Sequence, residues 1–220
     1  MSGAVIFDLD GVLIDSEGLQ YQAYAQVLER FGVRVTAEEY ARHWISTGLG
    51  PEYAVETYRL PVDAQQLRAL KQPIYREILR RHVSLMPGAI EALARLHTRF
   101  PLGLATNSNR ADVSFVVDQF GLERFFARIV TREDYVLPKP NPDAYLTAAA
   151  GLHAPPHACL VVEDTYRGIL AAHRAGAVPV AVPNSSTRTN DFSLAVAVFG
   201  SLDDLTVLVV EKLLTTRHEN

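Results

Sequence analysis

Two aspartates close the first apolar run of the chain. Asp8 and Asp10 lie in residues 4–12, a pattern typical of a buried strand that leads into a loop. Alternate side chains of a strand face one side, so we expect both carboxylates to point the same way. A cation or a reacting phosphorus atom would stabilise two like charges there, although a solvated turn also accommodates such a pair. The pair indicates a candidate catalytic site.

A second polar group follows the apolar run at residues 102–105. Thr106 and Asn107 supply hydroxyl, amide and backbone N–H groups at the end of this predicted strand. Such donors can hold phosphate oxygens where a helix begins just beyond them. A polar turn that only caps the next helix is the alternative interpretation.

A third candidate is Lys139, which stands between prolines in the segment 137–143. Three prolines stiffen this loop, and Pro142 occupies the position where a helix would start. A lysine in a fixed loop can neutralise an anionic substrate and neighbouring carboxylates. A proline-rich surface linker is the alternative.

A fourth pair of acids, Glu163 and Asp164, ends the apolar run 159–162. Oxygen ligands of this kind suit a hard cation such as Mg²⁺, which also keeps several waters and a substrate phosphate. The two acids could instead be a charge pair at a helix N-terminus, a role compatible with metal binding. Zinc is disfavoured because the seven histidines show no paired spacing and the single cysteine has no partner.

Short apolar runs alternate with helical patterns along most of the chain, which predicts a parallel sheet wrapped by helices. Ligands bind beyond the carboxyl ends of strands in such sheets, where all four polar segments lie. Glycines follow three of the helices and are expected to adopt the left-handed conformation, namely Gly121, Gly151 and Gly176. The predicted strands are 4–9, 101–106, 128–131, 158–162, 179–182 and 195–199, and the helices are 89–97, 111–120, 143–150, 166–175 and 202–214.

The segment 15–85 interrupts the alternation, because it shows helical periodicity and no convincing strand. We interpret it as an inserted helical domain, with helices over 17–31, 51–58 and 63–81 and another that begins with a capping box at Thr36. Core helices of a single domain would give the same periodicity.

Composition is that of a soluble globular protein: 48% hydrophobic residues, 21% charged residues and a mean hydropathy of +0.04. The net charge of −4 argues against a broad nucleic-acid surface. The N-terminus shows no leader pattern, and no apolar run approaches the length of a membrane span. We therefore expect a cytoplasmic protein, a monomer or small homo-oligomer, whose one cysteine, Cys159, is a buried thiol.

The order of these motifs resembles the haloacid dehalogenase superfamily. The resemblance is carried by Asp8-Leu9-Asp10-Gly11-Val12, then Thr106, then Lys139-Pro140 and then Glu163-Asp164, and it spans nearly the whole chain. It implies a Rossmann-like α/β core over residues 1–14 and 86–220, with sheet order 5-4-1-2-3. The insert 15–85 looks like the small helical cap domain of the phosphatase and β-phosphoglucomutase branch.

The resemblance also implies residue roles. Asp8 would attack phosphorus and form an aspartyl-phosphate, and Asp10 would protonate the leaving group and then activate water. Mg²⁺ would be held by Asp8, Asp164 and the backbone carbonyl of Asp10. Glu163 would lie nearby, bound to the ion through water or in contact with its direct ligands. The transferring phosphoryl group would be bound by the Thr106 hydroxyl, the Asn107 amide and the Lys139 ammonium.

Departures from related branches narrow the expected reaction. Asp10 disfavours the dehalogenases, which keep no acid there. The sugar-phosphate mutase has a cap histidine and a loop arginine where this chain has Gln20 and residues 48–50, Gly-Leu-Gly. A phosphonate hydrolase needs a cap lysine that forms a Schiff base, and no lysine precedes Lys71. We expect Mg²⁺-dependent hydrolysis of a small phosphate monoester, such as a sugar phosphate. A phosphosugar mutase and a non-catalytic binding or regulatory module are the alternatives.

The cap would contribute specificity by excluding water from the reaction. Several of its residues could face the leaving group, and each could equally be cap core or surface: Ser16, Gln20, His43, Trp44, Ser46, Thr47 and Lys71. Trp44 is expected to pack inside the cap.

Overall fold

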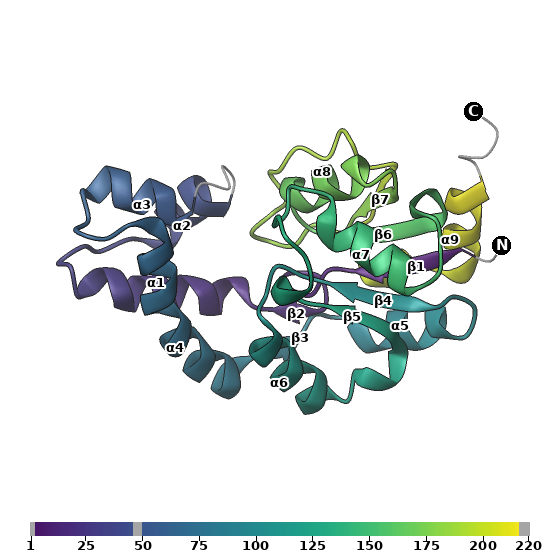
Figure 1. The fold of residues 1–220 in the computed structure, drawn as a ribbon, viewed down its shortest axis with the longest axis horizontal. Helices are drawn as coiled ribbons and strands as arrows, with labels where there is room; N and C mark the ends of the chain where they lie inside the picture. Colours follow the sequence, from purple (N-terminus) through teal and green to yellow (C-terminus); the bar gives the residue numbers. More distant parts are fainter. Residues whose placement is uncertain (1–2, 46–49, 216–220) are drawn as a thin grey trace. The chain divides into compact units, whose positions relative to one another are not determined.

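A computed structural model describes residues 3–45 and 50–215 (Figure 1). Its strands are β1 (Ala4–Phe7), β2 (Ile14–Asp15), β3 (Ser84–Leu85), β4 (Leu102–Ala105), β5 (Phe126–Val130), β6 (Cys159–Glu163), β7 (Val178–Ala181) and β8 (Ala197–Val198). Its α-helices are α1 (Glu17–Glu29), α2 (Ala37–Tyr40), α3 (Pro51–Tyr58), α4 (Ala64–His82), α5 (Ala89–His97), α6 (Arg110–Phe120), α7 (Asp143–Gly151), α8 (Tyr166–Arg174) and α9 (Val207–Thr215).

Six strands form one parallel sheet in the order β5-β4-β1-β6-β7-β8, and β2 and β3 form a separate two-stranded sheet. Strand β1 is central, because Phe7 is in register with Leu104 on one side and with Val162 on the other. The three carboxyl ends therefore meet at one edge of the sheet. This arrangement confirms the predicted α/β fold and the adjacency of the strands that precede Asp8 and Asp164.

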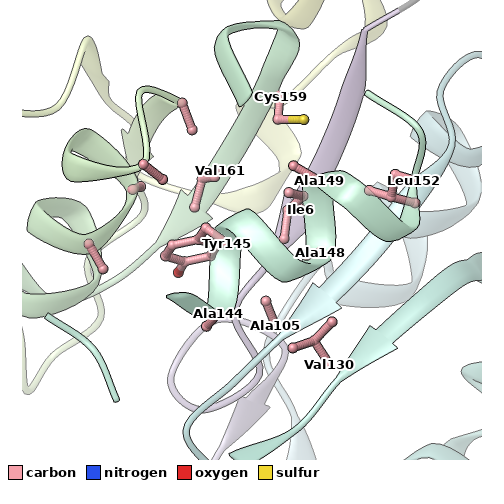
Figure 2. Packing of buried hydrophobic residues seen from close by; sticks show 14 of the residues in the cluster. Ile6, Ala105, Val130, Ala144, Tyr145, Ala148, Ala149, Leu152, Cys159 and Val161 are labelled. Carbon is pink, nitrogen blue, oxygen red and sulfur yellow. The ribbon is translucent and has the colours of Figure 1, made fainter. Parts of the chain in front are cut away.

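The body of the sheet is apolar on both faces. Every residue of β1, β4, β6 and β7 apart from Glu163 is apolar or glycine, and all are buried, as expected where helices cover both sides. On one face Ile6 and Val161 pack with helix α7, where Tyr145 and Ala148 are central to the cluster (Figure 2). Because these side chains are apolar and buried, the groups of the sheet that could take part in chemistry are the polar ones at the strand ends.

Two expectations about helix ends are wrong. Gly121 and Gly176 have positive φ as predicted, but Gly151 is the last residue of α7, and the left-handed residue is His153 at φ 54°. The predicted helix 202–214 is instead a 3₁₀ turn at Leu202–Asp204 followed by α9. The capping box of Ser201 and Asp204 closes that turn, and Leu205 has non-helical backbone angles, so the helix restarts beyond it.

By internal contacts the chain divides into two compact units. Unit 1 comprises Met1–Ile14, Leu85–Ser185 and Asn190–Asn220, and unit 2 comprises Asp15–Ser84 and Ser186–Thr189. Unit 2 contains the predicted helices, with one difference. Thr36 caps α2 by accepting from the N–H of Glu39, but α2 passes after one turn into a π-helical turn, Ala41–Ile45.

The interior of unit 2 is an aromatic cluster. Tyr24, Tyr40 and Trp44 pack with tilted rings whose centroids lie 4.6 to 6.5 Å apart, and helices α1 and α4 pack around them. Trp44 is 5% exposed, which confirms its predicted packing inside this unit. In the described part of the chain, no helix combines the length and apolarity needed to span a membrane.

Candidate active site

Asp8 follows β1 directly, and the Lys139 ammonium is its close partner. Lys139 Nζ lies 2.5 Å from Asp8 Oδ1, 2.8 Å from Glu163 Oε1 and 2.9 Å from the carbonyl oxygen of Ala105. These three acceptors match the three protons of an ammonium group. Lys139 is 4% exposed and Asp8 is 7% exposed, so the ion pair is largely shielded from water. The predicted Asp8 and Lys139 are thus brought together.

Glu163 anchors this arrangement from the opposite side. Its Oε1 accepts from Lys139 and from the Tyr145 hydroxyl at 2.6 Å, and its Oε2 accepts from the N–H of Asp164 and the hydroxyl of Thr165, both at 3.1 Å. A Cβ at Gly168 would lie 1.8 Å from Glu163 Oε1. The carboxylate therefore occupies space that only a glycine in α8 leaves open.

Burial and charge together set the ionisation of these groups. Burial raises the pKa of Asp8 well above its ordinary value, and the Glu163 and Asp10 carboxylates add to the increase against the opposing effect of Lys139. Burial acts in the same upward direction on Glu163, but Lys139 together with hydrogen bonds from Tyr145 and Thr165 outweighs burial and lowers the pKa of Glu163. Burial opposes the charge on Lys139, yet Asp8 and Glu163 raise its pKa. Lys139 and Glu163 therefore form a stable ion pair. A further positive charge would stabilise the ionised form of Asp8.

Asp10 is held by hydroxyl groups from the loop after β4. Ser108 Oγ donates to Asp10 Oδ2 at 2.6 Å, and Thr106 Oγ1 donates to the same oxygen at 3.3 Å. The N–H of Ser108 donates to Thr106 Oγ1 at 3.0 Å, which orients that hydroxyl. The predicted Thr106 therefore lies beside Asp10, together with Ser108, which was not predicted as a site residue.

Asn107 supports the Lys139 loop. Its Oδ1 accepts from the Tyr135 hydroxyl at 2.7 Å and from the N–H of Lys139 at 3.1 Å. From α8, Arg167 donates to the carbonyl oxygen of Lys139 at 2.7 Å, and Arg174 to that of Pro140 at 3.0 Å. The loop is thus fixed from two sides, as its prolines suggested. Phosphate binding by Asn107 stays a prediction.

Asp164 lies beside the loop that follows β1. Its Oδ2 accepts from Asn184 Nδ2 at 2.8 Å, and a Cβ at Gly11 would lie 2.2 Å from that oxygen. Gly11 has φ +78°, which an L side chain rarely adopts. The glycine of the first motif is therefore needed both for its backbone angle and for the space beside Asp164.

Three carboxylates form a possible cation site. Asp8, Glu163 and Asp164 are buried, and each offers a ligand oxygen within 4.8 Å of the others. Their combined charge exceeds that of Lys139, and hard oxygen donors are what Mg²⁺ or Ca²⁺ prefers. Because the donors of Lys139, Tyr145 and Thr165 already occupy both Glu163 oxygens, Asp8 and Asp164 suit direct ligation better. The residues present fit a divalent cation.

The candidates in unit 2 have less distinctive surroundings. Lys71 donates to Gln20 Oε1 at 2.6 Å, and its Nζ lies 4.3 Å from the ring centroid of Tyr75. His43 stacks on Tyr53 with parallel rings 4.7 Å apart. Ser46 and Thr47 lie outside the described residues. A leaving-group contact by any of these residues stays a prediction.

Several residues of the site were not identified from the sequence, among them Ser108, Tyr145, Arg167 and Asn184. Ser108 and Arg167 stand next to predicted motifs, so proximity was an available signal for both. Tyr145 reads as an apolar helix position, and Asn184 follows Pro183 in a polar loop, so neither position suggests a distant carboxylate partner.

Comparison with known proteins supports the motif pattern. The sequence profile of the haloacid dehalogenase-like hydrolase family matches residues 5–182. A probable pseudouridine-5′-phosphatase from Drosophila melanogaster is 34% identical over 207 residues, which cover 90% of this chain and 89% of that protein. A bifunctional riboflavin kinase/FMN phosphatase from Arabidopsis thaliana is 31% identical over 211 residues. The match covers 93% of this chain but only 55% of the length of that longer protein.

Solved structures show the same fold. A crystal structure of a CbbY variant from Rhodobacter sphaeroides, in complex with xylulose-1,5-bisphosphate, superposes with a TM-score of 0.79. Its sequence is 25% identical, and the match covers 93% of this chain and 96% of that one.

Proposed function

Because the chain belongs to the haloacid dehalogenase-like hydrolase family, we propose that it is a Mg²⁺-dependent phosphatase of small phosphate monoesters. The observation that carries this proposal is the position of Asp8. It lies at the carboxyl end of the central strand, 2.5 Å from Lys139 and within one acidic cluster with Asp164. The proposed nucleophile, the Lys139 ammonium and the proposed metal ligands therefore lie together, which supports this proposal.

The first half-reaction forms a bond between a carboxylate oxygen of Asp8 and phosphorus and breaks the bond between phosphorus and the ester oxygen. Asp10 donates its proton to that leaving oxygen, which departs as an alcohol. Ser108 and Thr106 donate to Asp10 Oδ2, so the transferred proton resides on Oδ1. The hydroxyls thereby fix the orientation of the acid.

In the second half-reaction Asp10 removes a proton from water, whose oxygen attacks phosphorus. The bond between phosphorus and Asp8 breaks, which releases inorganic phosphate and regenerates the carboxylate. Lys139 supplies a fixed positive charge beside Asp8 throughout, and Thr106 and Asn107 are proposed to orient the phosphoryl group. Mg²⁺, when bound by Asp8, Asp164 and the Asp10 carbonyl, would offset the repulsion between two anions.

The substrate class is proposed from the relatives. Their names specify pseudouridine-5′-phosphate and FMN as substrates, and the CbbY complex contains a sugar bisphosphate. Phosphorylated sugars and related small metabolites are therefore the expected esters. We assign unit 2 as the cap that selects among them.

The proposal is tested by phosphate release from p-nitrophenyl phosphate and from a panel of sugar phosphates and nucleoside monophosphates. We expect Asp8→Asn to reduce kcat by at least about 10³-fold, since the covalent route is lost. The matched control is Asp118→Asn, an exposed aspartate of α6, which should retain parental activity. Equal activity of Asp8→Asn and the parent would refute the mechanism.

Two further measurements separate the alternatives. EDTA should abolish phosphate release and Mg²⁺ should restore it, whereas activity that is indifferent to chelation would remove the metal from the proposal. Interconversion of β-glucose 1-phosphate and glucose 6-phosphate that outpaces phosphate release would identify a mutase instead.

A further inference from the structure

We propose that Asn184 is a positioning residue for the cation site, acting through Asp164 and the loop at Gly11. It lies in the loop after β7, outside the four sequence motifs. The inference rests on the metal site of the proposed function, which two chain segments form, and adds a third segment to it.

The amide of Asn184 joins two segments that are distant in sequence. Its Nδ2 donates to Asp164 Oδ2 at 2.8 Å and to the carbonyl oxygen of Gly11 at 3.1 Å. A carboxamide nitrogen has two protons, so both of these acceptors can be satisfied at once. Because both contacts require a donor, they also determine which end of the amide faces Asp164.

The backbone at Gly11 is shaped around this pair. A Cβ there would lie 2.2 Å from Asp164 Oδ2 and 2.9 Å from Asn184 Nδ2. The carboxylate and the amide therefore fill the volume that a side chain at this position would need. Gly11 also follows Asp10, whose carbonyl is a proposed ligand, so Asn184 holds a side-chain ligand and the segment of a backbone ligand together.

The chemical type of the contact distinguishes Asp164 from the other acids of the cluster. Lys139 contacts both Asp8 and Glu163 and neutralises part of their charge. Asn184 orients Asp164 through a neutral donor, a hydrogen bond that adds no positive charge beside the carboxylate. With Oδ2 engaged by the amide, the carboxylate presents Oδ1 to the cation. Partners of this kind typically change metal affinity by about 10- to 100-fold when they are removed.

The test is direct binding of Mn²⁺ to chelator-treated protein, measured by electron paramagnetic resonance of the free ion. Asn184→Ala removes both hydrogen bonds, and Asn184→Leu removes them at similar side-chain volume. We expect the Kd for Mn²⁺ to rise at least about 10-fold in both variants. A Kd within twofold of the parent value in a folded variant would overturn the inference.

Asn190→Ala is the matched control. Asn190 lies in the same loop, but its Oδ1 accepts from the N–H of Tyr166 at 2.9 Å, so this contact is to a backbone group of α8 and not to the Asp164 carboxylate. Its Kd for Mn²⁺ should equal that of the parent, and an equal loss of affinity would refute a specific role for Asn184.

If neither Asn184 variant folds, the parent protein provides the decisive measurement. In a Mg²⁺ titration followed by nuclear magnetic resonance, the side-chain amide signals of Asn184 should shift with occupancy, while those of Asn190 stay unchanged. An unshifted Asn184 signal would overturn the inference. Failure of the proposed function is distinguishable, because a parent that binds Mn²⁺ but hydrolyses no phosphate ester refutes only the phosphatase assignment.

Discussion

Unit 1 and unit 2 each contain a buried lysine beside a tyrosine ring. Lys139 and Lys71 are 4% and 7% exposed, and each ammonium lies within 4.5 Å of a tyrosine ring centroid. Lys139 forms ion pairs with two buried carboxylates, whereas Lys71 donates to the neutral amide of Gln20. Lys139 therefore compensates two buried carboxylates, and its removal would leave those two like charges facing each other.

The largest expected effect comes from removing the two ammonium groups in turn. Lys139→Met should lower the free energy of unfolding by about 3–5 kcal/mol, because two buried carboxylates lose their counterion. Lys71→Met should lower it by about 1–2 kcal/mol through loss of the charged hydrogen bond to Gln20 and of the cation–π contact with Tyr75. Guanidinium denaturation followed by circular dichroism gives both values.

Phosphatase activity sharpens the same comparison. Lys139→Met should also reduce kcat by at least about 10²-fold, since a fixed charge beside the reacting phosphorus is lost. If Lys71→Met proves as destabilising as Lys139→Met, the distinction between the two environments is wrong.

A second comparison uses two glycines near helix starts. A Cβ at Gly168 in α8 would overlap the Glu163 carboxylate, whereas a Cβ at Gly18 in α1 would have no atom within 4 Å. Gly168→Ala should destabilise the protein by about 1–3 kcal/mol through overpacking. Gly18→Ala should stabilise it by up to about 1 kcal/mol, because alanine favours the helix. The midpoint of thermal unfolding should fall for the first variant and rise for the second; a fall for both would contradict this interpretation.

The smallest expected effect concerns an ionic contact outside the active site. Partial burial acts to raise the pKa of Asp134, but hydrogen bonds from Thr131 and Arg110 outweigh burial and lower it. A lowered pKa gives stability that is present above the unfolded value and is lost as the pH falls through the folded value. Asp134→Asn should therefore cost about 1 kcal/mol at pH 7.

The stability curve with pH checks this prediction. The difference between parent and Asp134→Asn should shrink as the pH falls below about 4, the ordinary range of an aspartate. A difference that is constant down to pH 3 would mean that the charge of Asp134 contributes nothing.

Local patterns predicted most of the framework. The runs that became β1, β4 and β6 are apolar without interruption, and burial on both faces of a sheet requires this composition. Once these strands were parallel, the acids at their ends had to meet, so Asp8 and Asp164 could be assigned to one site. Lys139, in the loop beyond β5, was assigned to it through the resemblance of its motif. The 3₁₀ turn at Leu202–Asp204 escaped prediction because Leu202 and Leu205, three residues apart, continue the helical spacing of the apolar residues that follow.

The supporting contacts were not predictable from the sequence because they depend on distant partners. Asn184 is 20 residues from Asp164, and Tyr145 is 18 residues from Glu163. No periodicity links such pairs. Gly151 shows the same limit at a helix end, since His153 takes the left-handed conformation instead.

Cys159 lies inside the sheet, where burial raises the pKa of its thiol to about 11. Its sulfur should therefore stay inert toward maleimide and disulfide reagents at neutral pH, because the thiolate is the reactive form. As it is also the single cysteine of the chain, a second one placed on an exposed surface would accept a fluorophore or spin label selectively. The native sequence thus already provides a background for spectroscopic labelling, with no residue to be replaced first.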